Sequence, residues 1–265
     1  MTPFHDKESV RLFLFLGGLV FFLVAELSIP YRPITVSKSR RWVHNLGITF
    51  FNSLVLKLCF ASLIFASLEY VQKNNIGLLA TLSSPRWVKF VATLFVFDFI
   101  LYLWHRVNHE MPFFWRFHRV HHTDLNMDVS TATRFHIGEL TFSAILKIVL
   151  IFLLGPTGLG LVIFESTIVL CAQFHHSSVK VPAWFEKLFW ILFVPPSMHR
   201  IHHSVIIKQR NTNYGTIFSL WDRMGKTFLR DVDQEKIRIG IGAYPHASAL
   251  TFFALFRMPF TKAVK

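Results

Sequence analysis

Long apolar segments constrain this chain more than any other feature of its sequence. They occupy residues 10–29, 46–68, 87–104, 140–154 and 158–174, and the first is long enough to cross a bilayer as a helix. The last two are joined by GPTGLG at 155–160, whose glycines and proline interrupt a helix. We therefore predict an all-α integral membrane protein with about four to five transmembrane helices, including a helical hairpin. Because 140–154 is short, the sequence leaves open whether that segment crosses the membrane completely.

Composition indicates the same class of protein. The 265 residues are 52% hydrophobic and include 30 phenylalanines, which favours a membrane protein over a soluble domain. Two further apolar pieces, 183–194 and 250–260, are too short to span a bilayer. Their aromatic residues are mixed with charged ones, which fits helices at the membrane interface or ordinary core helices.

The formal net charge of +13 could indicate a nucleic-acid partner. The basic residues lie between apolar segments, however, where lipid headgroups and the positive-inside rule account for them, so we expect no nucleic acid. Arg32, Lys38, Arg40 and Arg41 follow the first segment without a nearby acid, which places that loop in the cytoplasm. Alternating from there puts residues 105–139 and 175–265 on the cytoplasmic side. A cytoplasmic cap would then hold all the histidine clusters.

Histidines gather near the ends of the apolar segments. The clusters are His105-x-x-x-His109, His118-x-x-His121-His122, His175-His176 and His199-x-x-His202-His203. Residues three and four positions apart share one face of a helix, so the side chains of one cluster can converge. Adjacent histidines point in different directions, so one cluster can serve two nearby metals. Neutral imidazole is a good ligand for iron, zinc or copper. The isolated His5, His44 and His246 are expected to be structural.

Other residues narrow the kind of metal site. Cys59 and Cys171 lie inside apolar runs, so neither a disulfide framework nor a thiolate site can be built. The zinc-protease pattern His-Glu-x-x-His is absent, because Met-Pro-Phe follows His109-Glu110. The Glu-x-x-His pairs of soluble di-iron bundles are also absent from the clusters. A nearly all-histidine site with this many ligands indicates two metals rather than one.

Together these stretches resemble the fatty acid hydroxylase / sterol desaturase superfamily of membrane di-iron oxygenases, in particular its bacterial sterol-desaturase-like members. The resemblance covers roughly residues 90–230 and is carried by HRVNH (105–109), WRFHRVHHTDLNMDVSTATRFH (115–136), HHSSV (175–179) and PPSMHRIHHSVIIKQRNTNYGTIFSLWDRMGKTF (195–228). Carried over by position, it implies as metal ligands His105, His109, His118, His121, His122, His176, His199, His202 and His203. It also implies that His136 and His175 ligate a metal or support a ligand.

The resemblance implies an organisation as well. Residues 1–86 would form N-terminal transmembrane helices, 87–230 the fatty acid hydroxylase-like catalytic core, and 231–265 a C-terminal interfacial tail. The expected location is a bacterial inner membrane, with the active site facing the cytoplasm.

Two carboxylates within apolar segments are candidates for supporting the site. Asp98 shares a helix face with the first histidine cluster, and Glu165 stands in the same relation to His176. A membrane-embedded carboxylate is usually functional or paired, and a pairing with Lys57 or Lys147 is the alternative. We expect Lys57 and Asp98 to face protein rather than lipid.

Asn213-Tyr214-Gly215 matches a stretch common in this superfamily. Asn213 or Tyr214 would donate a hydrogen bond that supports a ligand histidine. The alternative is a turn that shapes the site entrance, in which Gly215 adopts a positive φ.

The resemblance implies an oxidoreductase that hydroxylates or desaturates a lipid C–H bond with O2. Two Fe ions would be the cofactor, and Zn can replace them in preparations. The substrate would be a sterol, fatty acyl or related lipid. With no G-x-G-x-x-G loop and too few cysteines for a cluster, electrons would come from a separate ferredoxin or cytochrome with its reductase. Basic residues near the clusters would dock that donor or contact headgroups: Arg106, Arg116, Arg119, Lys208 and Arg210.

Two other functions stay open. A zinc-dependent membrane lipid hydrolase would activate water at an open site, against which the large number of histidines argues. A non-enzymatic membrane metal-binding or transport protein would distribute histidines along its spanning segments, whereas here they lie at the ends.

Overall fold

The computed structural model describes residues 3–262 and 264 as an all-helical protein. Five helical segments within that range are long and apolar enough to cross a membrane: Ser9–Ser28, Lys38–Thr81, Arg86–Glu110, Ile137–Leu154 and Gly158–His176. The predicted fold class is confirmed. The fourth segment is longer than its apolar run, and its 18 residues rise about 27 Å as an α-helix, close to the thickness of the hydrocarbon core.

The long helices are α1 (Pro3–Ser28), α2 (Lys38–Leu56), α3 (Ser62–Lys73), α5 (Arg86–Glu110), α7 (Ile137–Leu154) and α8 (Gly158–His176), and a π-helical turn, η1 (Lys57–Ala61), joins α2 to α3. The short helices are α4 (Leu78–Thr81), α6 (Pro112–His122), η2 (Val129–Thr133), α9 (Ala183–Leu192), α10 (Pro196–His202), α11 (Ile207–Arg210), α12 (Leu220–Met224), η3 (Ala247–Ala249), α13 (Phe252–Arg257) and η4 (Met258–Phe260).

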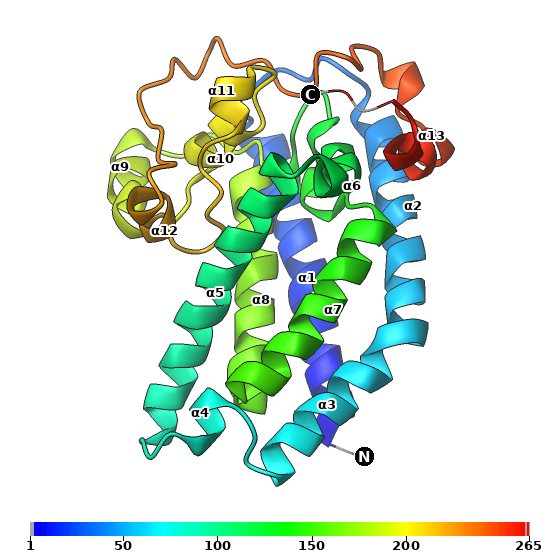
Figure 1. Ribbon diagram of the computed structural model, residues 1–265. Helices are drawn as coiled ribbons and strands as arrows, with labels where there is room; N and C mark the ends of the chain where they lie inside the picture. Colours follow the sequence, from blue (N-terminus) through cyan, green and yellow to red (C-terminus); the bar gives the residue numbers. More distant parts are fainter. Residues whose placement is uncertain (1–2, 263, 265) are drawn as a thin grey trace.

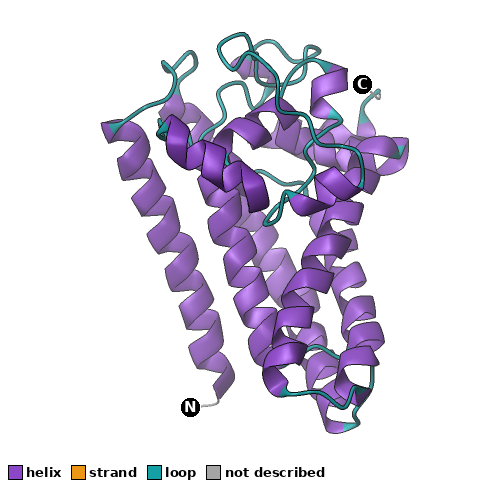
Figure 2. Ribbon diagram, turned by 90° about the vertical axis from the view of Figure 1, so that its left-hand side faces the viewer, coloured by secondary structure: helices purple, strands orange, loops and turns teal. Residues whose placement is uncertain are grey.

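The long helices form a bundle with a cap at one end. In Figure 1 they run roughly side by side, while α6 and α9 to α13 gather at the end where the C-terminus lies. The N-terminus lies at the opposite end, and the view turned by 90° shows the same division (Figure 2). This arrangement agrees with the predicted histidine-rich cap on a membrane bundle.

Apolar packing and a close turn hold the bundle together. Val71, Phe97, Ile151 and Phe164 from four of the long helices share one buried cluster. At the turn between α7 and α8, Gly155 has a φ of 59°, and a Cβ there would lie 2.2 Å from the carbonyl oxygen of Ile76. Glycine is therefore needed for the backbone conformation and for the close approach, as the helix-breaking pattern at 155–160 predicts.

Two buried charges of the N-terminal helices hold the segment after α6. The guanidinium of Arg41 donates to Asp124 at 2.5 Å and to Asp128 at 2.8 Å. Glu26, near the end of α1, accepts from the backbone N–H of Val129 at 2.7 Å and of Ser178 at 2.9 Å. Residues outside the predicted catalytic core thus fix the chain that follows two of its histidine clusters.

The short apolar helices pack on one side and expose the other. In α9, Trp184, Leu188 and Ile191 are exposed, whereas Trp190 is buried. In α13, Phe253 is exposed and Leu255 is buried. These helices therefore have features of both alternatives, an interfacial helix and a core helix. Their position at a membrane interface stays a prediction.

Lys57 lies at the π-helical turn and is exposed, so the prediction that it faces protein is wrong. A lysine can tolerate such a position because its long stem carries the charge away from apolar surroundings.

Candidate metal centre

The helices α5, α6, α8 and α10 bring nine histidines together in the cap. His105 and His109 lie in the last turns of α5, His118, His121 and His122 end α6, His176 ends α8, and His199, His202 and His203 lie on or directly after α10. Proline occupies the first position of both short helices, Pro112 in α6 and Pro196 in α10. Its fixed φ and missing N–H suit that position, so each histidine cluster lies on a helix with a defined start.

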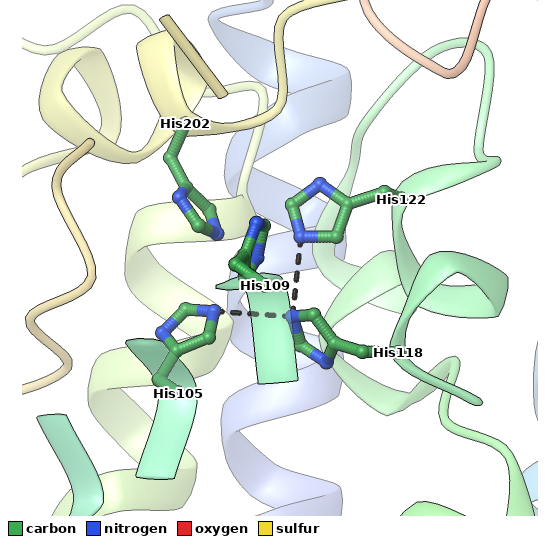
Figure 3. A group of neighbouring side chains, drawn as sticks. All are labelled: His105, His109, His118, His122 and His202. Carbon is green, nitrogen blue, oxygen red and sulfur yellow. Dashed lines mark hydrogen bonds between the residues drawn. The ribbon is translucent and has the colours of Figure 1, made fainter. Parts of the chain in front are cut away.

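The ligand atoms of these histidines form two compact groups. The five-histidine group contains His105, His109, His118, His122 and His202 (Figure 3), and the four-histidine group contains His121, His176, His199 and His203. Within each group, all the ligand nitrogens lie within 4.8 Å of one another. All nine histidines that the family resemblance implies as ligands thus fall into one group or the other.

The two His-x-x-His-His boxes are divided between the groups in opposite ways. His118 and His122, the outer pair of the first box, enter the five-histidine group, and His121 enters the four-histidine group. In the second box, the outer pair enters the four-histidine group, and His202 enters the five-histidine group. Each box therefore contributes to two neighbouring sites, as its spacing predicts.

Hydrogen bonds show which nitrogens face the five-histidine group. Nδ1 of His105 donates to the carbonyl oxygen of Tyr214 at 2.7 Å, and Nδ1 of His118 donates to Glu139 at 2.8 Å. Both Nδ1 atoms therefore carry the proton, which leaves a lone pair on each Nε2. These two Nε2 atoms are nevertheless only 3.1 Å apart (Figure 3). A proton between them would create a buried imidazolium, whereas a metal ion satisfies both lone pairs.

The four-histidine group shows the same pattern. Nδ1 of His176 donates to the carbonyl oxygen of Ala172 at 2.7 Å. Its Nε2 lies 3.0 Å from Nε2 of His121 and 2.9 Å from Nε2 of His199. The donor sets of both groups therefore fit a bound metal ion.

Burial keeps these imidazoles in the form that binds metal. Burial, followed by the neighbouring His203, holds the pKa of His122 well below its usual value. Burial, followed by His121, does the same to the pKa of His203. Neutral imidazole is the ligand form, so the site favours metal over protons.

A family comparison agrees with this geometry. The model of the fatty acid hydroxylase family matches residues 90–227, more than half of the chain, and the matched range contains all nine histidines. The chain belongs to the fatty acid hydroxylase family. The resemblance seen in the histidine boxes is thereby confirmed.

Relatives of the chain are about a quarter to a third identical to it over the aligned residues. An ornithine lipid hydroxylase of Rhizobium tropici is 29% identical over 178 residues, which is 67% of this chain and 52% of that protein. An alkylglycerol monooxygenase of Caenorhabditis elegans is 34% identical over 137 residues, 51% of this chain and 26% of that protein. A cholesterol 25-hydroxylase of Rattus norvegicus is 24% identical over 226 residues, 80% of this chain and 72% of that protein. The chain thus spans about half or less of the first two. No solved structure matches it.

A loop after α11 holds two of the nine histidines through its backbone. The carbonyl oxygens of Thr212 and Tyr214 accept from Nδ1 of His202 at 2.8 Å and from Nδ1 of His105 at 2.7 Å. Tyr214 therefore contacts His105, a predicted ligand, by accepting through its carbonyl group, rather than by donating from its hydroxyl as the sequence suggested.

Asn213 gives this loop its shape. It has a φ of 57°, and its side chain accepts from the N–H of Leu229 at 2.9 Å. The expectation of a positive φ at Gly215 is wrong, because Asn213 adopts the left-handed conformation that asparagine tolerates. Gly215 instead permits a close approach, since a Cβ there would lie 2.8 Å from a carboxylate oxygen of Asp222.

Asp98 supports the same loop from α5. It accepts from the N–H groups of Ile217 and Phe218 at 3.3 and 3.1 Å, and from the indole of Trp221 at 2.8 Å. Asp98 is buried, as predicted, and it binds the loop rather than a ligand histidine.

Three other candidates lie outside both groups. Glu165 pairs with Lys147 and, at 2.8 Å, with Arg11, so the pairing alternative describes it. His136 caps α7, because its Nδ1 accepts from the N–H of Gly138 at 2.9 Å. His175 packs against the ligand ring of His199, with centroids 3.9 Å apart, and supports the four-histidine group from the side.

Glu139, which is not among the residues predicted from the sequence, accepts a hydrogen bond from His118 through its carboxylate. The available signal was its position: an acidic residue directly before the apolar run 140–154 and three residues after His136. Only the fold brings this residue to a histidine 21 positions earlier.

Arg119 and Arg200, the arginines of the two boxes, turn away from the metal groups. Arg119 donates to the carbonyl oxygens of Met258 and, at 2.9 Å, Lys262, both near the C-terminus. Arg200 donates to Gln234 at 2.8 Å, and its guanidinium lies 3.7 Å from the ring centroid of Tyr31. Both arginines are buried. A buried guanidinium cannot contact a docked protein, so Arg119 is not one of the residues that dock an electron donor. Arg210, which is also buried, is excluded for the same reason.

Proposed function

We propose that this member of the fatty acid hydroxylase family is a membrane-bound hydroxylase that acts on a C–H bond of a lipid. The observation that carries the proposal is the pair of buried histidine groups, each with its ligand nitrogens within 4.8 Å of one another. Relatives named as ornithine lipid hydroxylase, alkylglycerol monooxygenase and cholesterol 25-hydroxylase support a lipid substrate. Because all three are hydroxylases or monooxygenases, we favour hydroxylation over desaturation.

The nine histidines would hold two iron ions, which supply the activation of dioxygen and the removal of hydrogen from an unactivated C–H bond. The chain itself supplies position and shielding. The carbonyl groups of Thr212 and Tyr214 orient two ligands, Asp98 holds their loop, and the buried rings exclude water from the centre. A fixed site of this kind aligns one carbon of the lipid for reaction.

The proposal includes the surroundings of the site. Residues 87–230 form the catalytic core, supported by the helices of 1–86 and by the tail at 231–265. The lipid enters from the bilayer, and a separate ferredoxin or cytochrome with its reductase supplies electrons. We place the protein in a bacterial inner membrane with the cap in the cytoplasm, because the basic loop at 32–41 lies at the same end as the cap.

The experiment that tests the proposal is metal analysis joined to an oxygen-dependent assay. Protein purified in detergent without added metal is compared with the double variant His202→Ala/His203→Ala, which removes one ligand from each group. We expect about two iron ions per chain, a sharp loss in the variant, and lipid hydroxylation only with O2 and a reductant. Glu165→Gln provides a control variant at a partly buried carboxylate outside the site.

Other outcomes would favour the alternatives. Zinc that persists after anaerobic iron reconstitution, with lipid hydrolysis that does not need O2, would favour a zinc-dependent hydrolase. Bound metal without turnover of any lipid would favour a metal-binding or transport protein. Folded wild-type protein with little metal of any kind would contradict the proposed function.

A further inference from the structure

A carboxylate holds one of the ligand histidines. Nδ1 of His118 donates to Oε1 of Glu139 at 2.8 Å, and both side chains are buried. In Figure 3, one ring nitrogen of His118 faces His105 and His122, while the other points away from the group. An imidazole that donates its Nδ1–H to a carboxylate keeps Nε2 directed at the metal and becomes a more basic ligand.

The start of α7 places Glu139 for this contact. His136 is the N-cap, and its Nδ1 accepts from the N–H of Gly138. A Cβ on Gly138 would lie 2.5 Å from the ring of Phe117, so glycine lets α7 begin close against α6. Glu139 is the third residue of the helix, where the helix dipole favours a negative charge. His136, although not in either metal group, thus helps to present the carboxylate.

The carboxylate of Glu139 contacts His118 through one oxygen. Among the described residues, its second oxygen, Oε2, has no hydrogen-bond partner. Among the ion pairs within residues 3–262 and 264, Glu139 pairs only with His118. No lysine or arginine in that range therefore forms an ion pair with Glu139.

His118 differs in this respect from the other ligands. A backbone carbonyl oxygen accepts from Nδ1 in His105, His176 and His202. The amide oxygen of Asn211 faces Nδ1 of His109. Among the described residues, Nδ1 has no hydrogen-bond partner in the other four, His121, His122, His199 and His203. Asp124, which follows the first box closely, is committed to Arg41, Asn45 and Thr131. In the described part of the chain, the carboxylate contact therefore belongs to the five-histidine group only.

We propose that Glu139 is a positioning residue that increases the difference between the two metal sites, which already have five and four histidines. Through His118 it adds negative charge to the five-histidine group, which binds its ion more tightly and makes that ion harder to reduce than the ion of the four-histidine group. The four-histidine group would then hold the ion that is easier to reduce. This inference rests on the two-metal function proposed above, and it assigns a separate role to a residue that is not itself a ligand.

The variant Glu139→Gln tests the inference. Glutamine keeps an oxygen that can accept from Nδ1 of His118, so the ring stays oriented while the charge is lost. Purified, metal-loaded protein is exposed to increasing concentrations of a chelator, and the metal that remains bound is counted. We expect the wild type to lose its ions in two steps. In the variant, the tighter step should weaken by about 10- to 100-fold while the other step stays unchanged. Reductive titration of the iron-loaded variant should also show a smaller difference between the reduction potentials of the two ions than in the wild type.

Two further variants separate charge from structure. Glu165→Gln makes the same change at a partly buried carboxylate that pairs with Lys147 and Arg11, and it should leave both steps unchanged. Glu139→Asp keeps the charge at a shorter reach, so it should retain the tighter ion better than Glu139→Gln. If Glu139→Gln folds poorly, Glu139→Asp is compared with the wild type instead, and the longer distance from its carboxylate to His118 should weaken only the tighter step.

The outcomes distinguish the inference from the proposed function. If Glu139→Gln holds both ions as tightly as the wild type, or weakens both equally, the inference is overturned and the hydroxylase proposal stands. If Glu139→Asp is no better than Glu139→Gln, the charge is not the cause and the inference is also overturned. If the wild type holds fewer than two ions, the two-metal function itself fails.

Discussion

The imidazole rings of His122 and His203 stack on each other, with centroids 4.3 Å apart and planes 20° from parallel. They are the last residues of the two His-x-x-His-His boxes, and they belong to different metal groups. Burial, followed in each case by a neighbouring histidine, holds the pKa of both well below the usual value. The two histidine groups are therefore in direct contact through neutral imidazole rings, and ions bound in them would lie close together.

Single ligand substitutions should separate the two groups. His203→Ala leaves three histidines in its group, whereas His122→Ala leaves four in the other. Because fewer remaining ligands hold an ion less firmly, we expect His203→Ala to retain about one metal ion per chain and His122→Ala to retain nearly two. Metal counting by mass spectrometry on both purified variants checks this expectation. Equal losses in the two variants would contradict a division into separate groups.

Asp98 should stabilise the protein through the loop that holds two ligands. Asp98→Asn removes the charge and one acceptor from three hydrogen bonds. Since hydrogen bonds to charged groups are worth about 1.5–3 kcal/mol each, we expect a loss of about 2–4 kcal/mol in the free energy of unfolding. Trp221→Phe removes one of these bonds and should cost about 1–2 kcal/mol. Thermal unfolding in detergent measures both. A larger loss for Trp221→Phe would count against Asp98 as the anchor.

The pair formed by Asp124 and Arg41 should make stability depend on pH. Burial alone would raise the pKa of Asp124, but the charge and hydrogen bonds of Arg41, together with the charge of Arg134 and the hydrogen bond from Thr131, outweigh burial and hold this pKa well below its ordinary value of 3.8. The stabilisation is therefore fully present above about pH 4, and it is lost as the pH falls through the lower, folded-state pKa. We expect the wild-type Tm to fall on acidification below about pH 4, more steeply than that of Asp124→Asn. If Tm falls with pH equally steeply in the wild type and in Asp124→Asn, the pair formed by Asp124 and Arg41 is not the cause of the pH dependence.

Arg119 should hold the C-terminal segment onto α6. Its guanidinium donates to the carbonyl oxygens of Met258, Thr261 and Lys262. Lysine cannot reach several acceptors with one planar group, so Arg119→Lys should lower the free energy of unfolding by about 1–3 kcal/mol. It should also speed proteolytic cleavage within residues 252–262. Limited proteolysis followed by mass spectrometry measures this effect.

The neighbouring Arg116 offers a matched control for that substitution. It lies on the same helix and is exposed. Arg116→Lys should leave both the unfolding and the cleavage rate nearly unchanged. Similar effects of the two substitutions would show that the tail does not depend on Arg119.

Local sequence patterns were sufficient for the helices and for the kind of site. Apolar length predicts the bundle, and glycine and proline predict the break at 155–160, because both act within a few residues of one another. The spacing of the boxes predicts that one helix face gathers several imidazoles and that a box serves two groups. Both predictions from the boxes depend only on the periodicity of an α-helix, which acts within a few residues.

Tertiary packing decided the rest. Asp98 and Glu165 look alike in the sequence, yet Asp98 meets backbone N–H groups of the loop that holds two ligands, while Glu165 meets Lys147 and Arg11. His136 belongs to a motif that implies a ligand or the support of one, and its nitrogen caps α7. Glu139 carries no motif and becomes the partner of His118. The partner of a buried polar group depends on which distant segment packs against it, and helix periodicity contains no information about that contact.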